Sequence, residues 1–423
     1  MIRKILIYLL LFSAVSAMAE NRFPKPQFEK GYLLPQTVVQ SPRAAVFDGM
    51  DVAVLFASLS LATWLILKKR SRRGVFLLSV FSLIYFGFWR KGCICSIGAI
   101  QNVTLWMFDS QYVLPLTVAA FFALPLMFSL LFGRVFCAGV CPFGAIQDLM
   151  ILFPVRLPRP VVTALKIVPH IYLGSGVLFA AAGAAFIICR LDPFVALFRL
   201  SGDLSMVLFG VILLLIGIFV ARPYCRFMCP FSVLLNWSSK LSKWHAKITP
   251  DECVVCRLCE QSCPFDAIIT PNKGQVSEER STGLSRLIKL LLLLPVLVLL
   301  VGWSVSRLDV VFSKISPDVQ LVEAFQQDDK IRLKTLAYEV EAFEGSGMKK
   351  EELFAKAATI QRKLRLGGWL FGGFLGAVFG IALLGVSVRR TRETYEPDRG
   401  DCLSCARCFK SCPKERQRLK SSL

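Results

Sequence analysis

Eight of the fifteen cysteines in this chain fall into two copies of one spacing, Cys-x2-Cys-x2-Cys-x3-Cys-Pro. Bacterial ferredoxins use this spacing to hold iron–sulfur cubanes in soft thiolate sulfur. Three closely spaced thiolates wrap one cluster, and the fourth, turned away by the proline, reaches a neighbouring cluster. The spacing therefore predicts two [4Fe-4S] clusters, held by two motifs that fold together. The predicted ligands are Cys253, Cys256, Cys259 and Cys263 in the first motif and Cys402, Cys405, Cys408 and Cys412 in the second.

Zinc and disulfides are the alternatives for these eight thiols. Structural zinc usually takes two Cys-x-x-Cys pairs that are separated by a longer stretch, whereas each motif here is compact. Cytoplasmic thiols are kept reduced, which argues against disulfides on that side of a membrane. Iron–sulfur clusters are the favoured interpretation.

Four further cysteines form two Cys-x3-Cys-Pro pairs, in which the proline suits the first turn of a new helix. Two thiols four residues apart share a helix face, but one pair supplies only half of a four-thiolate set. The two pairs together could hold a third cluster at the inner membrane surface, beside Arg134, Arg222 and Arg226. Reduced cysteines that simply pack at a helix start remain the alternative. The four cysteines are Cys137, Cys141, Cys225 and Cys229.

Three cysteines are left, and we expect them on the outer side of the membrane. Cys93, Cys95 and Cys189 could form one disulfide with a spare thiol, bind a metal, or make an outer redox station. We expect a disulfide or a structural role. Asp192-Pro193-Phe194 is expected to be a loop turn. An internal repeat relates Cys95–Asn102 to Cys141–Asp148 and suggests a duplicated loop-to-helix unit.

Several cofactor classes are disfavoured by what the sequence lacks. His170 and His245 are the only histidines, and no Cys-x-x-Cys-His motif occurs, so no haem is expected. No dinucleotide fingerprint and no P-loop are found. The chain is therefore predicted to be an electron-transfer component of an oxidoreductase system rather than a stand-alone enzyme.

Membrane spans must position these cysteines. The chain is 55% hydrophobic, with a mean hydropathy of +0.58. Its apolar runs approach the roughly 20 residues that cross a bilayer. We predict an α-helical polytopic membrane protein with about seven mature transmembrane helices and a small cytoplasmic ferredoxin-like module. The predicted spans are near 50–67, 74–89, 111–132, 162–188, 205–221, 287–306 and 368–388.

The charge pattern predicts the orientation of these spans. The net charge of +21 comes largely from Lys/Arg clusters beside apolar runs, at 68–73 and 389–392, so nucleic-acid binding is not expected. Such clusters mark cytoplasmic loops. A signal peptide or signal anchor over 1–19 would place the following segment, 20–49, in the periplasm. The predicted location is the bacterial inner membrane, with the clusters facing the cytoplasm.

The remaining boundaries follow from this orientation. The transmembrane core with both Cys-x3-Cys-Pro pairs covers 50–249, and the ferredoxin motifs lie in cytoplasmic segments 250–286 and 389–423. Between them lie a span at 287–306, a periplasmic loop at 307–366 and a last span at 367–388. The loop is expected to form two helices, about 318–344 and 349–365. In the last span, glycines at 368, 372, 376 and 380 line one face, for packing within the chain or for a dimer.

These residues carry a family resemblance. Arg134-Val135-Phe136-Cys137 and Arg222-Pro223-Tyr224-Cys225, each continued by x3-Cys-Pro and followed by a ferredoxin motif, resemble the NosR/NapH family of membrane-bound polyferredoxins. The resemblance covers roughly residues 50–270. It implies electron transfer between the quinone pool or a cytoplasmic donor and periplasmic reductases of anaerobic respiration, such as those for nitrous oxide and nitrate. Segment 20–49 is too short for the covalent-flavin domain of NosR-like members, and the two ferredoxin motifs are not in tandem as in NapH-like members.

The sequence thus predicts a lipid-embedded electron carrier whose outer loop, 307–366, docks a periplasmic redox protein or a flavoprotein subunit. One alternative is an assembly or maturation factor that reduces a metal or thiol during biogenesis of a respiratory enzyme, for which Cys93 and Cys95 would be suited. A membrane redox sensor is a second alternative, although no output module is visible in the sequence.

Overall fold

Long apolar helices dominate the computed structural model, which describes residues 44–92, 95–199, 203–248, 253–272, 280–327, 336–387 and 392–421. The predicted signal segment 1–19 and most of 20–49 lie outside these residues. The first half of the described chain contains α2 (Ala45–Leu67), α3 (Arg72–Ser82), the π-helical segment η1 (Leu83–Trp89), α4 (Ser96–Phe108), α5 (Leu116–Phe132), α6 (Val135–Gly139), α7 (Pro142–Met150), α8 (Arg159–Leu165) and α9 (Val168–Ala182).

The second half alternates short and long elements. It contains α10 (Ile187–Arg190), α11 (Pro193–Arg199), α12 (Leu204–Ile216), α13 (Pro223–Phe227), α14 (Pro230–Lys240), α15 (Leu258–Ser262), β1 (Ile268–Ile269), α16 (Arg280–Ser306), α17 (Asp309–Ser313), α18 (Pro317–Gln326), α20 (Ala337–Ser346), α21 (Lys350–Ser387), β2 (Glu396–Pro397), α22 (Arg407–Ser411) and α23 (Pro413–Ser421).

Five helices in the described residues are long and apolar enough to cross a membrane. They cover 46–67, 72–89, 160–182, 281–306 and 350–385, and a bent pair, 193–199 with 204–216, would make a sixth span. The predicted span at 111–132 corresponds to α5, which begins after Pro115 and is shorter than a full span. The prediction of about seven crossings is therefore supported only as a helical bundle with at least five candidate spans.

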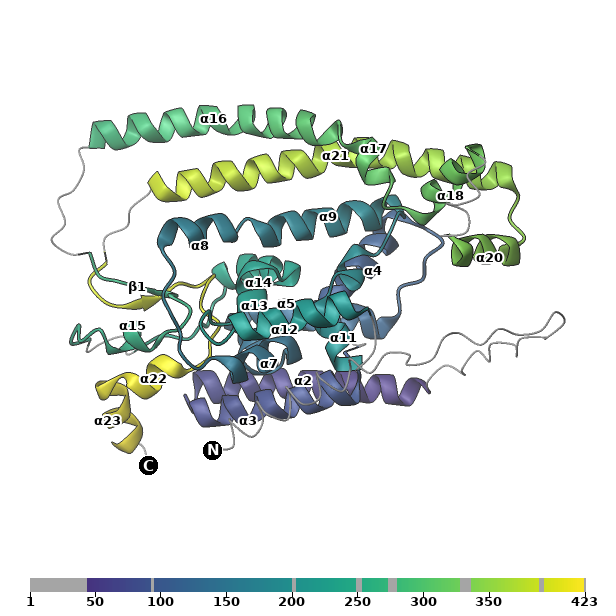
Figure 1. Cartoon of the computed structure of the whole chain (residues 1–423). Coiled ribbons are helices and arrows are strands. Elements are labelled where there is room, and N and C mark those ends of the chain that lie inside the picture. Colours follow the sequence, from purple (N-terminus) through teal and green to yellow (C-terminus); the bar gives the residue numbers. More distant parts are fainter. Residues whose placement is uncertain are drawn as a thin grey trace.

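The long helices pack in layers (Figure 1). α16 and α21 run side by side along one face, α9 packs under α21, and α2 with α3 lie along the opposite face. α5 and α14 pack against each other between these layers. The short elements β1, β2, α15 and α22 gather at one end of the bundle, and α17, α18 and α20 lie at the other.

Glycines allow the closest helix contact. A Cβ at Gly372 would lie 2.5 Å from the carbonyl oxygen of Val301, and a Cβ at Gly376 would lie 2.6 Å from that of Leu297. The glycine face predicted from sequence thus packs within the chain, against α16. The other side of α16 remains exposed, with Leu292 at 68%, which suits contact with lipid.

The outer segment differs from the two helices expected over 318–344 and 349–365. α18 and α20 are separate, with residues 328–335 outside the described part of the chain. α21 continues without a break from Lys350 to Ser387, through the boundary expected at 366–367. The amphipathic first half of α21 packs against α17 and α18, and its apolar second half packs against α16, so packing supports the helix along its whole length.

Candidate iron–sulfur sites

A two-stranded sheet joins the two ferredoxin motifs, although two long helices separate them in the sequence. β1 follows the first motif and pairs antiparallel with β2, which precedes the second, with Ile268 opposite Pro397. The backbone N–H of Asp398 also donates to the carbonyl of Ala267 at 2.8 Å. The helical turns α15 and α22, which carry the third cysteine of each motif, pack against each other. The structure therefore brings both motifs into one module.

Thiols from both motifs meet around one cavity. Cys263, the last cysteine of the first motif, lines a small cavity with Cys402, Cys405 and Cys408 of the second. Cys253 and Cys259 pack nearby in a separate small apolar cluster with Ile248 and Tyr395. This arrangement has one fourth cysteine crossing to the other motif, as in two-cluster ferredoxins.

The backbone wraps around the second cysteine of each motif in the same unusual way. Val255 and Arg257 flank Cys256 with φ of 51° and 63°, and Ser404 and Ala406 flank Cys405 with φ of 52° and 61°. Positive φ is strained for residues other than glycine, and most of all for a β-branched valine. Matched strain at equivalent places is typical of loops shaped to bind a group.

Cys259 and Cys405 are buried and Cys256 is exposed, and the other thiols of this module are half-buried. Partial burial already disfavours the charged form of a thiol. Burial raises the pKa of Cys402 to about 12 and that of Cys259 to about 11. Burial and the neighbouring Cys405 also raise the pKa of Cys263. These side chains would stay protonated without a positively charged partner. Iron supplies such charge to thiolates, so the donor set fits an iron–sulfur cluster.

The spread of the thiols also bears on zinc. Within the described part of the chain, no three His, Cys, Asp or Glu side chains are arranged to hold a single metal ion. A cubane binds each thiolate through a different iron, so its ligands stand farther apart than those of one ion. The preference for a cluster over zinc therefore rests on the two compact four-cysteine motifs.

The two Cys-x3-Cys-Pro pairs meet in the interior of the bundle. All four thiols are buried, and those of Cys141 and Cys229 both interact electrostatically with Cys137 and Cys225. Gln147 in α7 donates to the sulfur of Cys225 at 3.3 Å, and Gln147 Oε1 accepts from the backbone N–H of Tyr224 at 3.0 Å. A side chain of the first pair thus holds the loop of the second.

Arg134 connects this group of thiols to the ferredoxin module. Its Nη2 lies 3.7 Å from the sulfur of Cys137, and its Nη1 donates to the carbonyl of Gly400 at 3.0 Å. Gly400 lies two residues before Cys402. Arg134 is buried, so its charge acts on both groups of thiols with little screening by water.

A buried carboxylate ties the same two parts together. Asp148 in α7 forms ion pairs with Arg222 at 3.2 Å, with Arg407 of α22 at 3.0 Å and with Arg72 of α3. Burial alone would raise its pKa, but the three guanidinium groups hold the pKa of Asp148 well below its usual range. Asp148 was not predicted to be a functional residue, although the internal repeat contains it.

The predicted roles of the three neighbouring arginines are refined by these contacts. Arg134 faces a thiol, whereas Arg222 is occupied by Asp148 and by the carbonyl of Cys137. Arg226 reaches Asp266 of the ferredoxin module, at 4.0 Å. All three therefore lie at the boundary between the core and the module.

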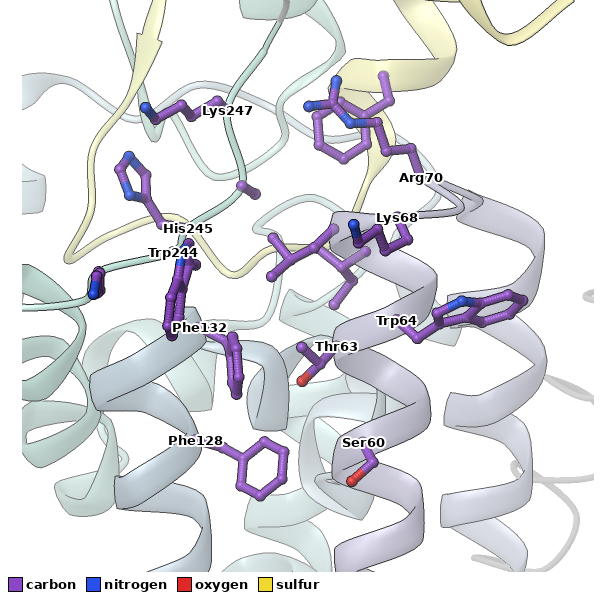
Figure 2. Close-up of a pocket in the computed structure, with 15 residues that line it drawn as sticks. Ser60, Thr63, Trp64, Lys68, Arg70, Phe128, Phe132, Trp244, His245 and Lys247 are labelled. Atoms are coloured by element: carbon purple, nitrogen blue, oxygen red, sulfur yellow. The ribbon is translucent and has the colours of Figure 1, made fainter. Parts of the chain in front are cut away.

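A large cavity adjoins the ferredoxin module (Figure 2). Its volume is about 820 Å³, and it lies between α2, α5, the segment after α14 and α22. Phe128, Phe132 and Trp244 form aromatic walls, and Ser60 and Thr63 project from α2. Lys68, Arg70, Lys243 and Lys247 make its lining basic, and its other lining residues include Trp64, His245, Ala246 and Phe409.

The two histidines occupy different surroundings. His245 lines the large cavity, and its buried Nδ1 has no hydrogen-bond partner. Burial, Arg399 and Lys247 lower its pKa, so the ring is neutral at pH 7. His170 Nδ1 lies 2.9 Å from the carbonyl of Lys166, and its ring packs near Trp237 and Phe374.

The outer cysteines lie on the other side of the Cys-x3-Cys-Pro thiols. Cys95 and Cys189 are not joined to each other in a disulfide, and Cys93 lies outside the described residues. Asp192 Oδ1 accepts from the backbone N–H of Phe194 at 3.0 Å and caps the start of α11, so Pro193 and Phe194 begin a helix and the expected loop turn is wrong. Cys95, Cys189 and Asp192 all line one cavity of about 240 Å³.

Family comparisons give the class of these sites. Residues 114–160 and 203–249 match a 4Fe-4S binding domain, and residues 246–269 match a second domain of that description. The first two ranges each contain one Cys-x3-Cys-Pro pair, and the third contains the first ferredoxin motif. The chain therefore carries 4Fe-4S binding domains, which confirms the prediction of iron–sulfur clusters but leaves their number open.

Several known proteins are similar to parts of this chain. An uncharacterised protein of Methanocaldococcus jannaschii is 29% identical over 45% of this chain and 82% of its own length. Protein NirI of Paracoccus denitrificans is 33% identical over 34% of this chain, and regulatory protein NosR of Stutzerimonas stutzeri is 29% identical over 47%. The aligned parts cover only 24% of NirI and 29% of NosR. No solved structure matches the chain.

The chain is thus similar to NosR and NirI and carries 4Fe-4S binding domains, which supports the resemblance to NosR-like membrane ferredoxins that the sequence motifs predicted. They support an iron–sulfur electron-transfer protein, and the apolar helices suggest that it is a membrane protein.

Proposed function

We propose that this protein relays electrons from quinol in the bacterial inner membrane to a periplasmic redox protein or flavoprotein subunit of an anaerobic respiratory reductase system, of the nitrous oxide or nitrate type. The proposal rests on the wall that the large cavity shares with the cavity around the ferredoxin thiols. Phe409 and Ala246 line both the large cavity and the cavity around Cys263, Cys402, Cys405 and Cys408.

Ligands for the clusters are assigned by motif and position. Cys402, Cys405, Cys408 and Cys263 would hold one [4Fe-4S] cluster, and Cys253, Cys256, Cys259 and Cys412 would hold a second. Cys137, Cys141, Cys225 and Cys229 would hold a third iron–sulfur cluster. When bound, such clusters supply one-electron carriers whose potentials depend on nearby charge and hydrogen bonds. Arg134 lies beside Cys137, where it would supply both a positive charge and a hydrogen bond to the third cluster.

The large cavity has the features that a quinol headgroup requires. Its volume falls within the usual range for small-molecule sites, and aromatic side chains dominate its walls. The hydroxyls of Ser60 and Thr63 on α2 and the neutral ring of His245, from the segment after α14, offer polar partners in the lining. His245 also lines the cavity, and its neutral ring would accept a proton from a quinol hydroxyl.

Iron analysis tests the cluster assignment. Protein purified anaerobically in detergent should contain at least twelve irons per chain, with matching acid-labile sulfide. The double variant Cys137→Ser/Cys225→Ser should lose about four of them and keep the dithionite-reduced EPR signals of the ferredoxin pair. About eight irons in both proteins would remove the third cluster from the proposal. Zinc without labile sulfide would overturn electron transfer itself.

A cavity variant tests the quinol assignment. Thr63→Trp should fill the cavity from α2, so quinol should reduce the clusters at least tenfold more slowly while dithionite reduces them fully. The matched control is Thr359→Trp, at an exposed position of α21, which should leave both reactions unchanged. Equal quinol rates in Thr63→Trp and wild type would place the electron donor elsewhere, such as a cytoplasmic protein.

A further inference from the structure

The outer cysteines reproduce the framework of the inner Cys-x3-Cys-Pro group. Cys95 directly precedes α4, as Cys141 directly precedes α7. Three residues after this cysteine, each helix has a glycine that a side chain from a partner loop closely approaches. A Cβ at Gly98 would lie 3.1 Å from the sulfur of Cys189, and a Cβ at Gly144 would lie 3.2 Å from the Arg222 guanidinium.

A glutamine in each unit holds the loop that brings the partner thiol. Gln147 Oε1 accepts from the backbone N–H of Tyr224, the residue before Cys225. Gln101, at the equivalent place in α4, accepts from the backbone N–H of Cys189 itself, at 3.2 Å. Gln101 and Gln147 are both fully buried, so these hydrogen bonds are part of the core. The two units therefore share a three-dimensional arrangement as well as a similar sequence.

The partner loops also correspond, with one replacement. Cys229 stands directly before Pro230 and α14, and Asp192 stands directly before Pro193 and α11. Asp192 is only 4% exposed, and its Oδ1 accepts a hydrogen bond from the backbone N–H of Phe194 at 3.0 Å. A carboxylate therefore occupies, in the outer unit, the place that a thiol has in the inner unit.

The three side chains surround a shared space. Cys95, Cys189 and Asp192 line the cavity of about 240 Å³, far more than the roughly 10–15 Å³ that one water needs. Asp48 and Arg199 are the other charged groups on its wall. Thiolates and carboxylates are both metal ligands, and soft sulfur in the majority favours iron–sulfur or similar centres over hard cations.

We propose that Cys95, Cys189 and Asp192 ligate a further iron–sulfur cluster, on the side of the inner Cys-x3-Cys-Pro group that faces away from the ferredoxin module. The proposal extends the proposed function, because it assumes that the inner group holds a cluster. Another cavity, lined by both Cys95 and Cys141, places the two sets next to each other, with Phe143 in its wall.

Aromatic contacts fill the space between the two sets. Phe143 stacks on Tyr224, with ring centroids 6.3 Å apart, and Phe194, two residues after Asp192, packs edge-on to Tyr224 at 5.2 Å. α4 and α11 lie toward the end of the molecule away from β1 and β2 (Figure 1). The outer set would thus be the last ligand group before that end.

Four variants test the proposal, with iron, labile sulfide and EPR as readouts rather than turnover. Cys189→Ser should lose about four irons and the matching sulfide, while the dithionite-reduced signals of the ferredoxin pair persist. Asp192→Ala should lose the same iron. Asp192→Cys, which restores the inner pattern, should keep the iron and change the EPR g values of one cluster. Asp109→Ala, at an exposed acid after α4, is the control and should match wild type.

The outcomes separate this site from the rest of the protein. Unchanged iron in Cys189→Ser, or a Cys95–Cys189 disulfide found by mass spectrometry in anaerobic wild-type protein, would overturn the proposal and leave the proposed function intact. If Cys189→Ser loses every cluster, the EPR spectrum of Asp192→Cys decides whether the outer site exists. Altered g values uphold the site, and a spectrum identical to wild type rejects it. Absence of labile sulfide from wild type would instead reject the proposed function.

Discussion

Asp148 lies at the centre of the junction between the core and the ferredoxin module. Its carboxylate is buried among Arg72, Arg222 and Arg407, which come from three different helices or helix starts. Arg72 also donates to the carbonyl of Cys405, at 3.2 Å. Without this anion, three cations would face one another in a low-dielectric interior, so one side chain makes the junction electrostatically possible.

Asp148→Asn should destabilise this junction, because it keeps the shape of the side chain and removes its charge. Loss of one partner from a buried ion pair costs about 3–5 kcal/mol. We expect a lower unfolding temperature in detergent and loss of the cluster signal assigned to Cys402, Cys405, Cys408 and Cys263. Asp109→Asn, at an exposed acid, serves as the control. Wild-type stability in Asp148→Asn would show that other groups compensate the arginines.

The titration of Asp148 has a defined direction. Its pKa is lowered in the folded protein, so the unfolded chain binds the proton more readily. The stabilisation is therefore fully present above the unfolded-state pKa of about 3.9 and is lost only as the pH falls toward the folded-state value. Between pH 7 and pH 5 this junction should not weaken.

The cysteines could be predicted from the sequence, but the residues that position their loops could not. Cysteine spacing reports ligand chemistry directly, so the ferredoxin motifs were visible as sets, and their folding together was expected from the fourth cysteine. Gln101, Gln147 and Asp148 act through contacts between loops that are far apart in the chain. Only the repeat that contains them could have drawn attention to these positions.

At the scale of elements, glycine spacing determines how closely α16 and α21 approach. The sequence predicted this face because four-residue intervals align on one side of a helix. It did not predict that α21 would run unbroken from Lys350. Polar and apolar halves look like separate segments in a hydropathy pattern, whereas a helix continues wherever packing supports its backbone.

Gly376→Ala should loosen the α16–α21 pair, because the new methyl group would overlap the backbone of Leu297 and Val298. Overpacking of this kind costs typically about 1–3 kcal/mol. Gly385→Ala adds the same methyl group to the same helix where nothing lies within 4 Å, so it is the matched control. Thermal unfolding in detergent should be lowered only for Gly376→Ala. Equal unfolding temperatures would contradict the close helix contact.

At the scale of the whole molecule, the two ends of the bundle differ in chemistry. The ferredoxin module and the 68–73 basic cluster lie at one end, and α17, α18 and α20 lie at the other. Lys/Arg-rich ends face the cytoplasm in bacterial membranes, so the module is expected there. Under the proposed function, the module would lie on the quinol side and the opposite end would be left for a periplasmic partner.

Reporter fusions test this orientation. Green fluorescent protein after residue 421 should fluoresce, because it folds in the cytoplasm, and alkaline phosphatase fused after residue 347 should be active, because it needs the oxidising periplasm. Fusions that exchange the two reporters at the same positions are the controls and should both be inactive. The opposite pattern would invert the membrane orientation and place the clusters outside.

The pairing of β1 with β2 also dictates when the protein can mature. The first strand leaves the ribosome well before the second, and α16 and α21 must both be inserted between these events. Cys263 therefore waits for Cys402, Cys405 and Cys408 until both of these helices have been synthesised. Under the proposed cluster assignment, loading of this centre would require that both helices are in place, and a chain that stops before Cys402 would be left with unfilled thiols.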